Sequence, residues 1–216
     1  MKLSSRLLIL GSVVGLLLVA FIGVGLYGLI AGPPEQNQEA TPNAPSDAPP
    51  PSPAPLVLAE LPKTENAEEF AQAVVQALFI WDTTRTSGPE VILEHLMTVA
   101  DPSGYEAPGL YGDLGRYLPT VEQWRQLREY DTRQQLNGVE VSVPAQWEAI
   151  AADPANELAD GTIAITVDAT RVREGGWHGE TTRDESPLEF TMFLICPPAT
   201  DHCALLRLSA LGSTLR

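Results

Sequence analysis

The chain has 216 residues, and its 28 Asp and Glu side chains against 13 Lys and Arg give a formal net charge of −15. Such an acidic chain repels phosphate, which argues strongly against direct binding of nucleic acid through charge. Both cysteines lie late in the chain, which argues against a disulfide-dense mini-protein and against a multi-cysteine metal module.

The first element is an uncharged stretch of 24 residues, from 7 to 30, which Lys2 and Arg6 precede. As a helix it is roughly 36 Å long, enough to cross a hydrocarbon core of about 30 Å. The positive-inside rule therefore predicts a cytoplasmic tail (1–6), a single-pass transmembrane helix (7–31) and an extracellular remainder. A cleaved signal peptide is the alternative, but its apolar region is usually only about 7–15 residues long. We therefore expect a retained anchor in the cell membrane.

A proline-rich segment follows the anchor. Residues 32–57 contain nine prolines and no aromatic side chain. Such a composition cannot bury enough surface to fold, and its prolines favour extended polyproline II. The sequence thus predicts a disordered extracytoplasmic linker over residues 32–60 and one folded domain over residues 61–216.

Capping signals and apolar side chains at helical spacing predict three helices in the first half of this domain. The first helix begins at Asn66, and Glu69 is expected to complete its cap. The second begins with a capping box at residues 87–90 and ends before Asp101. The third begins with a capping box at residues 120–123. Their apolar positions are Phe70, Val74, Leu78 and Trp81 in the first helix, and Trp124, Leu127 and Tyr130 in the third.

Alternating apolar side chains predict four strands in the second half. They lie around residues 139–143, 163–169, 188–194 and 206–210, and the glycine-containing segment 173–186 is expected to be a loop. Helices followed by a run of antiparallel strands predict an α+β domain with its helices on one face of the sheet.

Cys196 and Cys203 flank the turn between the last two predicted strands. They should face each other across a hairpin, and in an oxidising compartment this arrangement favours a disulfide. A metal site that includes Asp201 and His202 is one alternative, although adjacent residues rarely converge on one ion. A catalytic cysteine is another, but it would need a lowered thiol pKa, and no basic residue lies near in the sequence.

Candidates for acid–base chemistry are few. His95, Asp168, His178 and Glu180 could take part in proton transfer, but the histidines show no recognisable spacing. The chain has no nucleophile-elbow, phosphate-loop or zinc-protease motif. We therefore expect no catalytic residue, no cofactor and no metal site.

The layout of tail, membrane helix, proline-rich spacer and α+β domain resembles the TcpC-like family and the related bitopic assembly factors of type IV secretion systems. Four runs are similar to proteins of actinobacterial conjugative elements: ALFIWDTT (77–84), VADPSG (99–104), YLPTVEQWRQLREY (117–130) and LICPPATDHCALLRLS (194–209). The resemblance implies the cone-shaped fold of nuclear transport factor two, with three helices packed on a curved four-stranded antiparallel sheet.

The resemblance also implies a function: a membrane-anchored, non-enzymatic scaffold of a conjugative DNA-transfer apparatus. Its partners would be other membrane proteins of that apparatus. Self-association is a further expectation, because Gly11 and Gly15 match the small-residue packing motif of membrane helices.

Two alternatives remain open. One is an Mce-associated membrane protein that supports lipid import, which neighbouring genes would distinguish from a conjugation protein. The other is a cone-fold domain that binds a ligand or catalyses a reaction. An enzyme of this kind would need a deep cavity that holds an inward-facing Asp or His.

Overall fold

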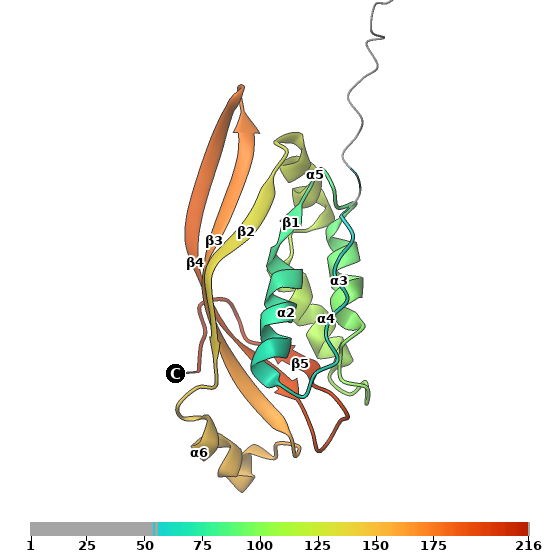
Figure 1. Cartoon of the computed structure of the whole chain (residues 1–216), viewed down its shortest axis with the longest axis vertical. Helices are drawn as coiled ribbons and strands as arrows, with labels where there is room; N and C mark the ends of the chain where they lie inside the picture. The colour runs from blue at the N-terminus through green and yellow to red at the C-terminus, as the bar shows by residue number, and fades with distance from the viewer. Residues whose placement is uncertain (1–53, 55, 216) are drawn as a thin grey trace, which may run out of the picture. The chain divides into compact units, whose positions relative to one another are not determined.

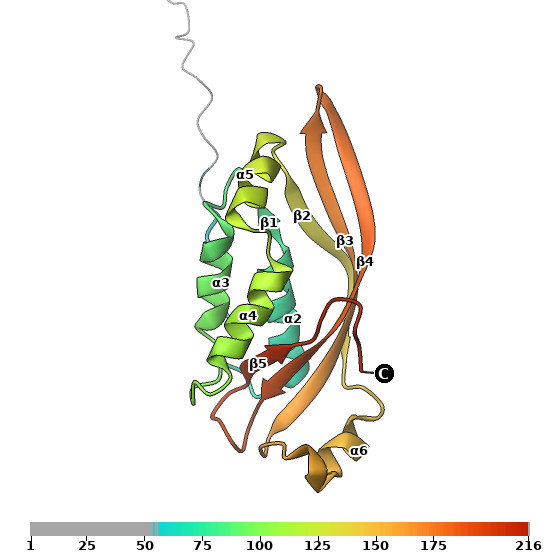
Figure 2. The same cartoon turned by 180° about the vertical axis from the view of Figure 1, so that it is seen from behind.

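A curled antiparallel sheet carries a layer of helices on one face (Figures 1 and 2). The structure is a computed structural model and describes residue 54 and residues 56–215. The predicted tail, the transmembrane helix and most of the linker lie outside these residues. Within the described part of the chain, no helix combines the length and the hydropathy that crossing a bilayer requires.

The helices from residue 67 to residue 129 form the layer beside the sheet, and the short helix Trp147–Ala152 lies at one end of the sheet (Figure 1). The layer includes one helix that the sequence did not predict, α4. The helical elements are α2 (Ala67–Phe79), α3 (Pro89–Met97), α4 (Ala107–Tyr117), α5 (Val121–Glu129), α6 (Trp147–Ala152) and the 3₁₀ turn η1 (Pro154–Asn156).

Within the described residues the sheet has five strands in the order β1-β2-β3-β4-β5, and every neighbouring pair is antiparallel. β3 and β4 form a continuous hairpin from the pair Thr162–Ile195 to the pair Trp177–Glu180. The strands are β1 (Trp81–Asp82), β2 (Arg133–Ser142), β3 (Thr162–Trp177), β4 (Glu180–Ile195) and β5 (Ala204–Leu208).

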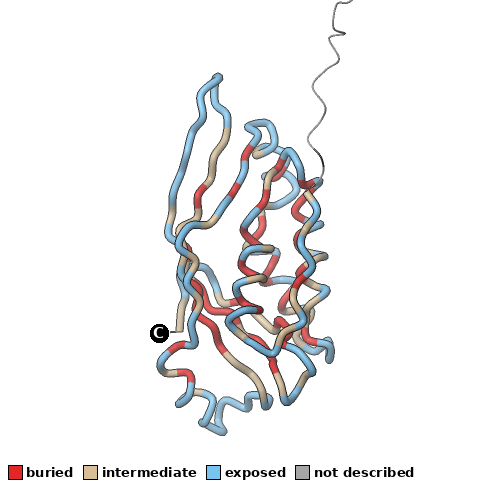
Figure 3. The backbone as a smooth tube through the Cα atoms, viewed as in Figure 1, coloured by how far each residue is buried: buried red, intermediate tan, exposed pale blue. Residues whose placement is uncertain are grey.

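The core lies between the helices and the half of the sheet nearest β5. Figure 3 shows buried residues gathered there, whereas the far end of the β3–β4 hairpin is exposed. The predicted alternation explains this core, because successive side chains of a strand point to opposite faces. Cross-strand pairs on the core face are Ile163–Leu194, Ile165–Met192, Val167–Phe190 and Ala169–Leu188.

Two of the three predicted helix caps are confirmed, and the remaining helix begins inside its predicted segment, at Pro89. The Asn66 side chain accepts hydrogen bonds from the backbone N–H groups of Glu68 and Glu69, and Thr120 and Gln123 form the complete capping box. The prediction that the Glu69 side chain completes this cap is wrong, because its carboxylate accepts a hydrogen bond from the Thr64 hydroxyl instead. The predicted box at residues 87–90 is also wrong, since α3 is capped by Gly88 with no side-chain hydrogen bond.

The described residues contain more helices than the three expected, and five strands instead of the four expected. Trp81 has the right spacing for the first helix, but that helix ends at Phe79 and Trp81 pairs with Gln134 as strand β1. The expected loop at residues 173–186 is paired strand, apart from the two-residue turn at His178 and Gly179. Both turn residues have positive φ, which matches the twist of a tight hairpin. The mixed α and β class and the antiparallel curled sheet agree with the prediction.

The chain enters the domain as an extended segment, residues 56–61, that runs beside α3 (Figure 1). The backbone N–H of Leu56 donates to the carbonyl of Arg85 at 2.9 Å, and the Arg85 Nε donates to the carbonyl of Ala54 at 3.2 Å. His95 Nε2 lies 2.9 Å from the Ala59 carbonyl oxygen. We call residue 54 and residues 56–61 the entry strap.

Candidate functional site

The two cysteines lie where the sequence predicts, directly after β4 and directly before β5. Their sulfur atoms are 2.02 Å apart, at the distance of a disulfide bond. Backbone hydrogen bonds hold both ends of the loop: Cys196 N–H donates to the Gly161 carbonyl at 2.9 Å, and Cys203 N–H donates to the Thr64 carbonyl at 2.8 Å. The loop between the cysteines is therefore fixed to the start of β3 and to the approach to α2.

The cysteine loop forms one wall of a pocket of about 760 Å³. The other walls are the α3–α4 connection (101–106) and the segment before β3 (157–159), and side chains of β4 and β5 also line the pocket. Apolar lining residues include Phe193, Ile195 and Leu206. This combination of a large volume, apolar lining and a few polar groups is typical of a ligand or partner site.

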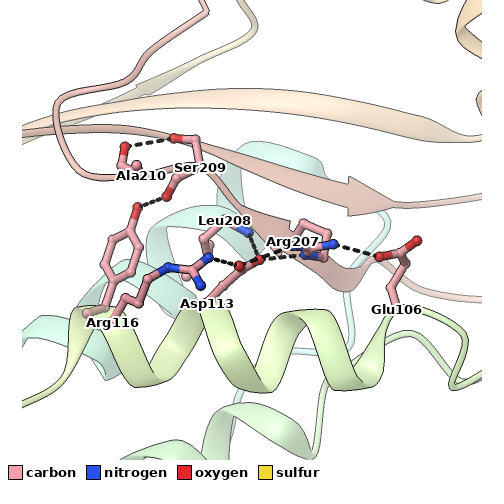
Figure 4. A network of polar contacts seen from close by, with 8 residues as sticks. Glu106, Asp113, Arg116, Arg207, Leu208, Ser209 and Ala210 are labelled. Atoms are coloured by element: carbon pink, nitrogen blue, oxygen red, sulfur yellow. Dashed lines mark hydrogen bonds and ion pairs between the residues drawn. The ribbon is translucent and has the colours of Figure 1, made fainter. Parts of the chain in front are cut away.

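An ionic network borders this pocket (Figure 4). Asp113 of α4 is only 1% exposed and accepts hydrogen bonds from Arg207 Nε at 2.6 Å and from the Leu208 N–H at 3.1 Å. Arg116 also donates to Asp113, and Arg207 Nη1 donates to Glu106 at 3.1 Å. The network ties β5 to α4.

The local sequence allows Arg207 to lie directly against α4. A Cβ atom at position 109 would lie 2.6 Å from the Arg207 guanidinium, so only glycine fits there without displacing that side chain. In addition, the Tyr117 hydroxyl donates to the Ser209 carbonyl at 2.6 Å, and burial raises the pKa of this tyrosine. Tyr117 therefore stays protonated and acts as a donor.

Burial by itself raises the pKa of Asp113, but the hydrogen bonds from Arg207 and Leu208 and the nearby positive charges outweigh it. The pKa of Asp113 consequently lies below its ordinary value of 3.8. A carboxylate with a lowered pKa, whose oxygens already accept several hydrogen bonds, is a poor general base. The chemistry of this network favours a structural tie at the pocket rather than proton transfer.

The structure does not gather the residues considered for acid–base chemistry. His95 lies on α3 and bonds the entry strap, Asp168 is exposed in the middle of β3, and His178 lies in the exposed hairpin turn beside the Trp177 ring. Glu180 follows that turn and pairs with Trp177. None of these four residues lines the 760 Å³ pocket.

Sequence reasoning missed the main polar residues of the site, Asp113 and Arg207. They are 94 residues apart, so no local motif joins them. The one local signal is the Asp113–Arg116 spacing of three, which brings an acid and a base together on a helix. That signal has meaning only within a helix, and Pro108 and the glycines of α4 favour other conformations.

Among the described residues, no three His, Cys, Asp or Glu side chains come together in a way that could hold a metal ion. The comparisons with known proteins are also negative: no family model matches the chain, and neither the curated proteins nor the solved structures give a match.

Proposed function

We propose that the chain is a membrane-anchored, non-enzymatic scaffold of a conjugative, type IV secretion-like apparatus, and that its outer domain recruits other membrane proteins. The proposal includes the anchor, the spacer and a cone-shaped fold for the domain. The curled sheet with its helix layer supports the fold, and the anchor–spacer–domain layout of the sequence supports the place at the membrane.

The observation that carries the proposal is the free edge of the β3–β4 hairpin. β4 pairs with β5 only from Met192 to Ile195, so residues 180–187 have no strand on their outer side within the described chain. Seven of these eight residues are exposed, and Trp177, at the end of β3, is 52% exposed. An open strand edge beside an exposed aromatic ring can bind a partner by strand addition.

The side chains along this edge make it selective. Arg183, Asp184, Glu185 and Pro187 carry charge or remove an N–H group, and such residues block indiscriminate pairing between sheet edges. A partner must therefore match the charges as well as the backbone. This favours a specific protein contact, as a scaffold requires.

Transfer of the genetic element tests the proposal. Deleting the gene should abolish transfer and leave growth unchanged, and the wild-type gene should restore it. The Thr181→Pro variant removes one backbone N–H near the tip of β4 and should lower transfer at least tenfold. The matched Thr181→Val variant keeps that N–H and should restore transfer fully.

Three results would contradict the proposal. Unchanged transfer in the deletion strain would remove the conjugative role. Full transfer with a folded Thr181→Pro variant would exclude the hairpin edge as the contact. A folded alanine variant of His95 or Asp168 that fails to restore transfer would favour an enzyme, since a scaffold that binds through the hairpin edge needs neither side chain.

A ligand-binding domain is the second candidate function, and the 760 Å³ pocket favours it. Its carboxylates, Asp101, Glu106 and Glu157, outnumber its one cationic residue, Arg207. A neutral or cationic apolar molecule would suit this lining better than an anion. Bound material that copurifies with the full-length chain, identified by native mass spectrometry, would distinguish this function from a scaffold without a ligand.

A further inference from the structure

A second pocket, of about 450 Å³, has a very different charge. It lies between the α4–α5 connection, α5 and strand β3, and all of its charged lining residues are arginines: Arg116, Arg171 and Arg173. Its other lining residues are polar or apolar and include Tyr117, Gln123 and Tyr130. A purely cationic pocket is unexpected in a chain with a net charge of −15. We call it the arginine pocket.

Two of these arginines continue the core face of the sheet. Ile165, Val167 and Ala169 of β3 point toward the helices, and by the same alternation so do Arg171 and Arg173. The apolar stripe thus ends in two cations that the fold directs inward rather than to open solvent. Both side chains are partly buried.

Neither arginine has a carboxylate within ion-pair distance among the described residues. Arg171 donates through Nη2 and Nε to the Ser186 hydroxyl oxygen at 2.9 and 3.2 Å. Arg173 donates through Nε to Gln134 Oε1 at 2.7 Å, and its guanidinium lies 5.5 Å from the Trp81 ring centroid. Only neutral groups therefore contact these two cations directly.

The charges near Arg173 do not balance. Asp184 lies opposite it on β4 and attracts it from beyond ion-pair distance. Burial nevertheless lowers the pKa of Arg173, and repulsion from Arg171 lowers it further. Two like charges held two residues apart on one strand face cost free energy, which an anion bound between them would recover.

We propose that the arginine pocket binds a small organic anion, a carboxylate or phosphate group on an apolar body. The planar guanidinium fork binds either group through two parallel hydrogen bonds. Leu118, Leu127 and the two tyrosines of the lining provide the apolar surface for the rest of the molecule. The scaffold proposal does not require this ligand, because the hairpin edge at residues 180–187 does not line the pocket and touches it only through Ser186, which accepts from Arg171.

Calorimetric titration of the full-length chain in detergent, at constant ionic strength, tests the site. The probes are benzoate for a carboxylate, phenyl phosphate for a phosphate, and inorganic phosphate for an oxyanion without an apolar body. We expect saturable binding of one molecule of benzoate or of phenyl phosphate, and weaker binding of inorganic phosphate. The aromatic probe that binds more tightly identifies the anionic group of the ligand.

Substitutions locate the binding. Arg171→Gln should weaken it at least tenfold, whereas Lys63→Gln, which removes the same charge from an exposed position outside the pocket, should leave it unchanged. If Arg171→Gln does not fold, Arg171→Lys keeps the charge but not the fork and should still weaken binding severalfold. Absence of saturable binding by all three probes, or wild-type affinity in a folded Arg171 variant, would overturn the proposal.

Discussion

A single buried carboxylate joins two distant parts of the domain. Asp113 accepts from two arginines and from the Leu208 N–H, which ties helix α4 to strand β5 (Figure 4). Loss of a buried carboxylate from an ion pair lowers the free energy of unfolding more than loss of an exposed one, because its partners lose hydrogen bonds that solvent screens only weakly. The position is therefore a sensitive test of the fold.

Replacing Asp113 by Asn keeps the shape of the side chain but removes its charge. Arg207 then retains only Glu106 as an ionic partner. Because the Arg207 side chain is 42% exposed and stays hydrated, the main loss is that of the charge-assisted hydrogen bonds, and we expect the free energy of unfolding to fall by about 2 kcal/mol in urea denaturation. Glu122→Gln is the control, since Glu122 pairs with Arg125 on the exposed face of α5 and its loss should leave the denaturation midpoint unchanged.

The same variant predicts a pH dependence. Because folding lowers the pKa of Asp113, its stabilisation is complete above the ordinary value of 3.8 and is lost as the pH falls through the lower folded value. The difference in unfolding free energy between wild type and Asp113→Asn should therefore shrink below about pH 3.8. A difference that does not change with pH would mean that the charge of Asp113 is not what stabilises the domain.

At the scale of single elements, two glycines with opposite requirements provide a matched test. Gly161 has φ +79°, and a Cβ atom there would lie 2.2 Å from the Cys196 carbonyl oxygen. Gly161→Ala should lower the free energy of unfolding by more than about 1 kcal/mol. Gly115 lies in α4 with open space around it, so Gly115→Ala should raise it by about 0.5–1 kcal/mol. Equal changes in the two denaturation midpoints would contradict this assignment.

Elements whose signal is local could be predicted from the sequence. The Thr120 capping box, the Asn66 cap and the paired alternation of β3 and β4 depend on residues a few positions apart or on a simple period of two. The facing cysteines follow from the same alternation, because it places them at adjoining strand ends.

Elements held by distant contacts could not be predicted. Helix α4 contains Pro108 and three glycines, which favour other conformations, and it is held by two fully buried leucines and the Asp113–Arg207 pair. The outer part of the hairpin is exposed on both faces, so its side chains do not alternate and it has the composition of a loop. The arginine pocket forms because α5 lies close to β3, and no periodic pattern in the sequence predicts that contact.

For the whole molecule, the main prediction is its placement across the membrane. Protease added to intact spheroplasts should digest the domain after residue 32 and leave the cytoplasmic tail protected. Alkylation without reductant, followed by mass spectrometry, should find Cys196 and Cys203 unmodified, because an oxidising compartment preserves their bond.

Each of these two assays has an outcome that would contradict the predicted placement. Digestion only after lysis would place the domain inside the cell, and two labelled thiols in protein from its native compartment would exclude a disulfide there. A mature chain that begins near residue 32 would show that the apolar stretch is a cleaved signal and not an anchor.

The entry strap gives the domain a mechanical property. A pull directed away from the helix layer would peel the strap from its N-terminal end, so the hydrogen bonds at Ala54, Leu56 and Ala59 would break in that order. Release of residues 56–59 would lengthen the tether by roughly 13 Å before tension reached the buried Leu61 and then α2. The strap would thus extend before α2 bears any load, and its release would withdraw Leu58, which packs against the core.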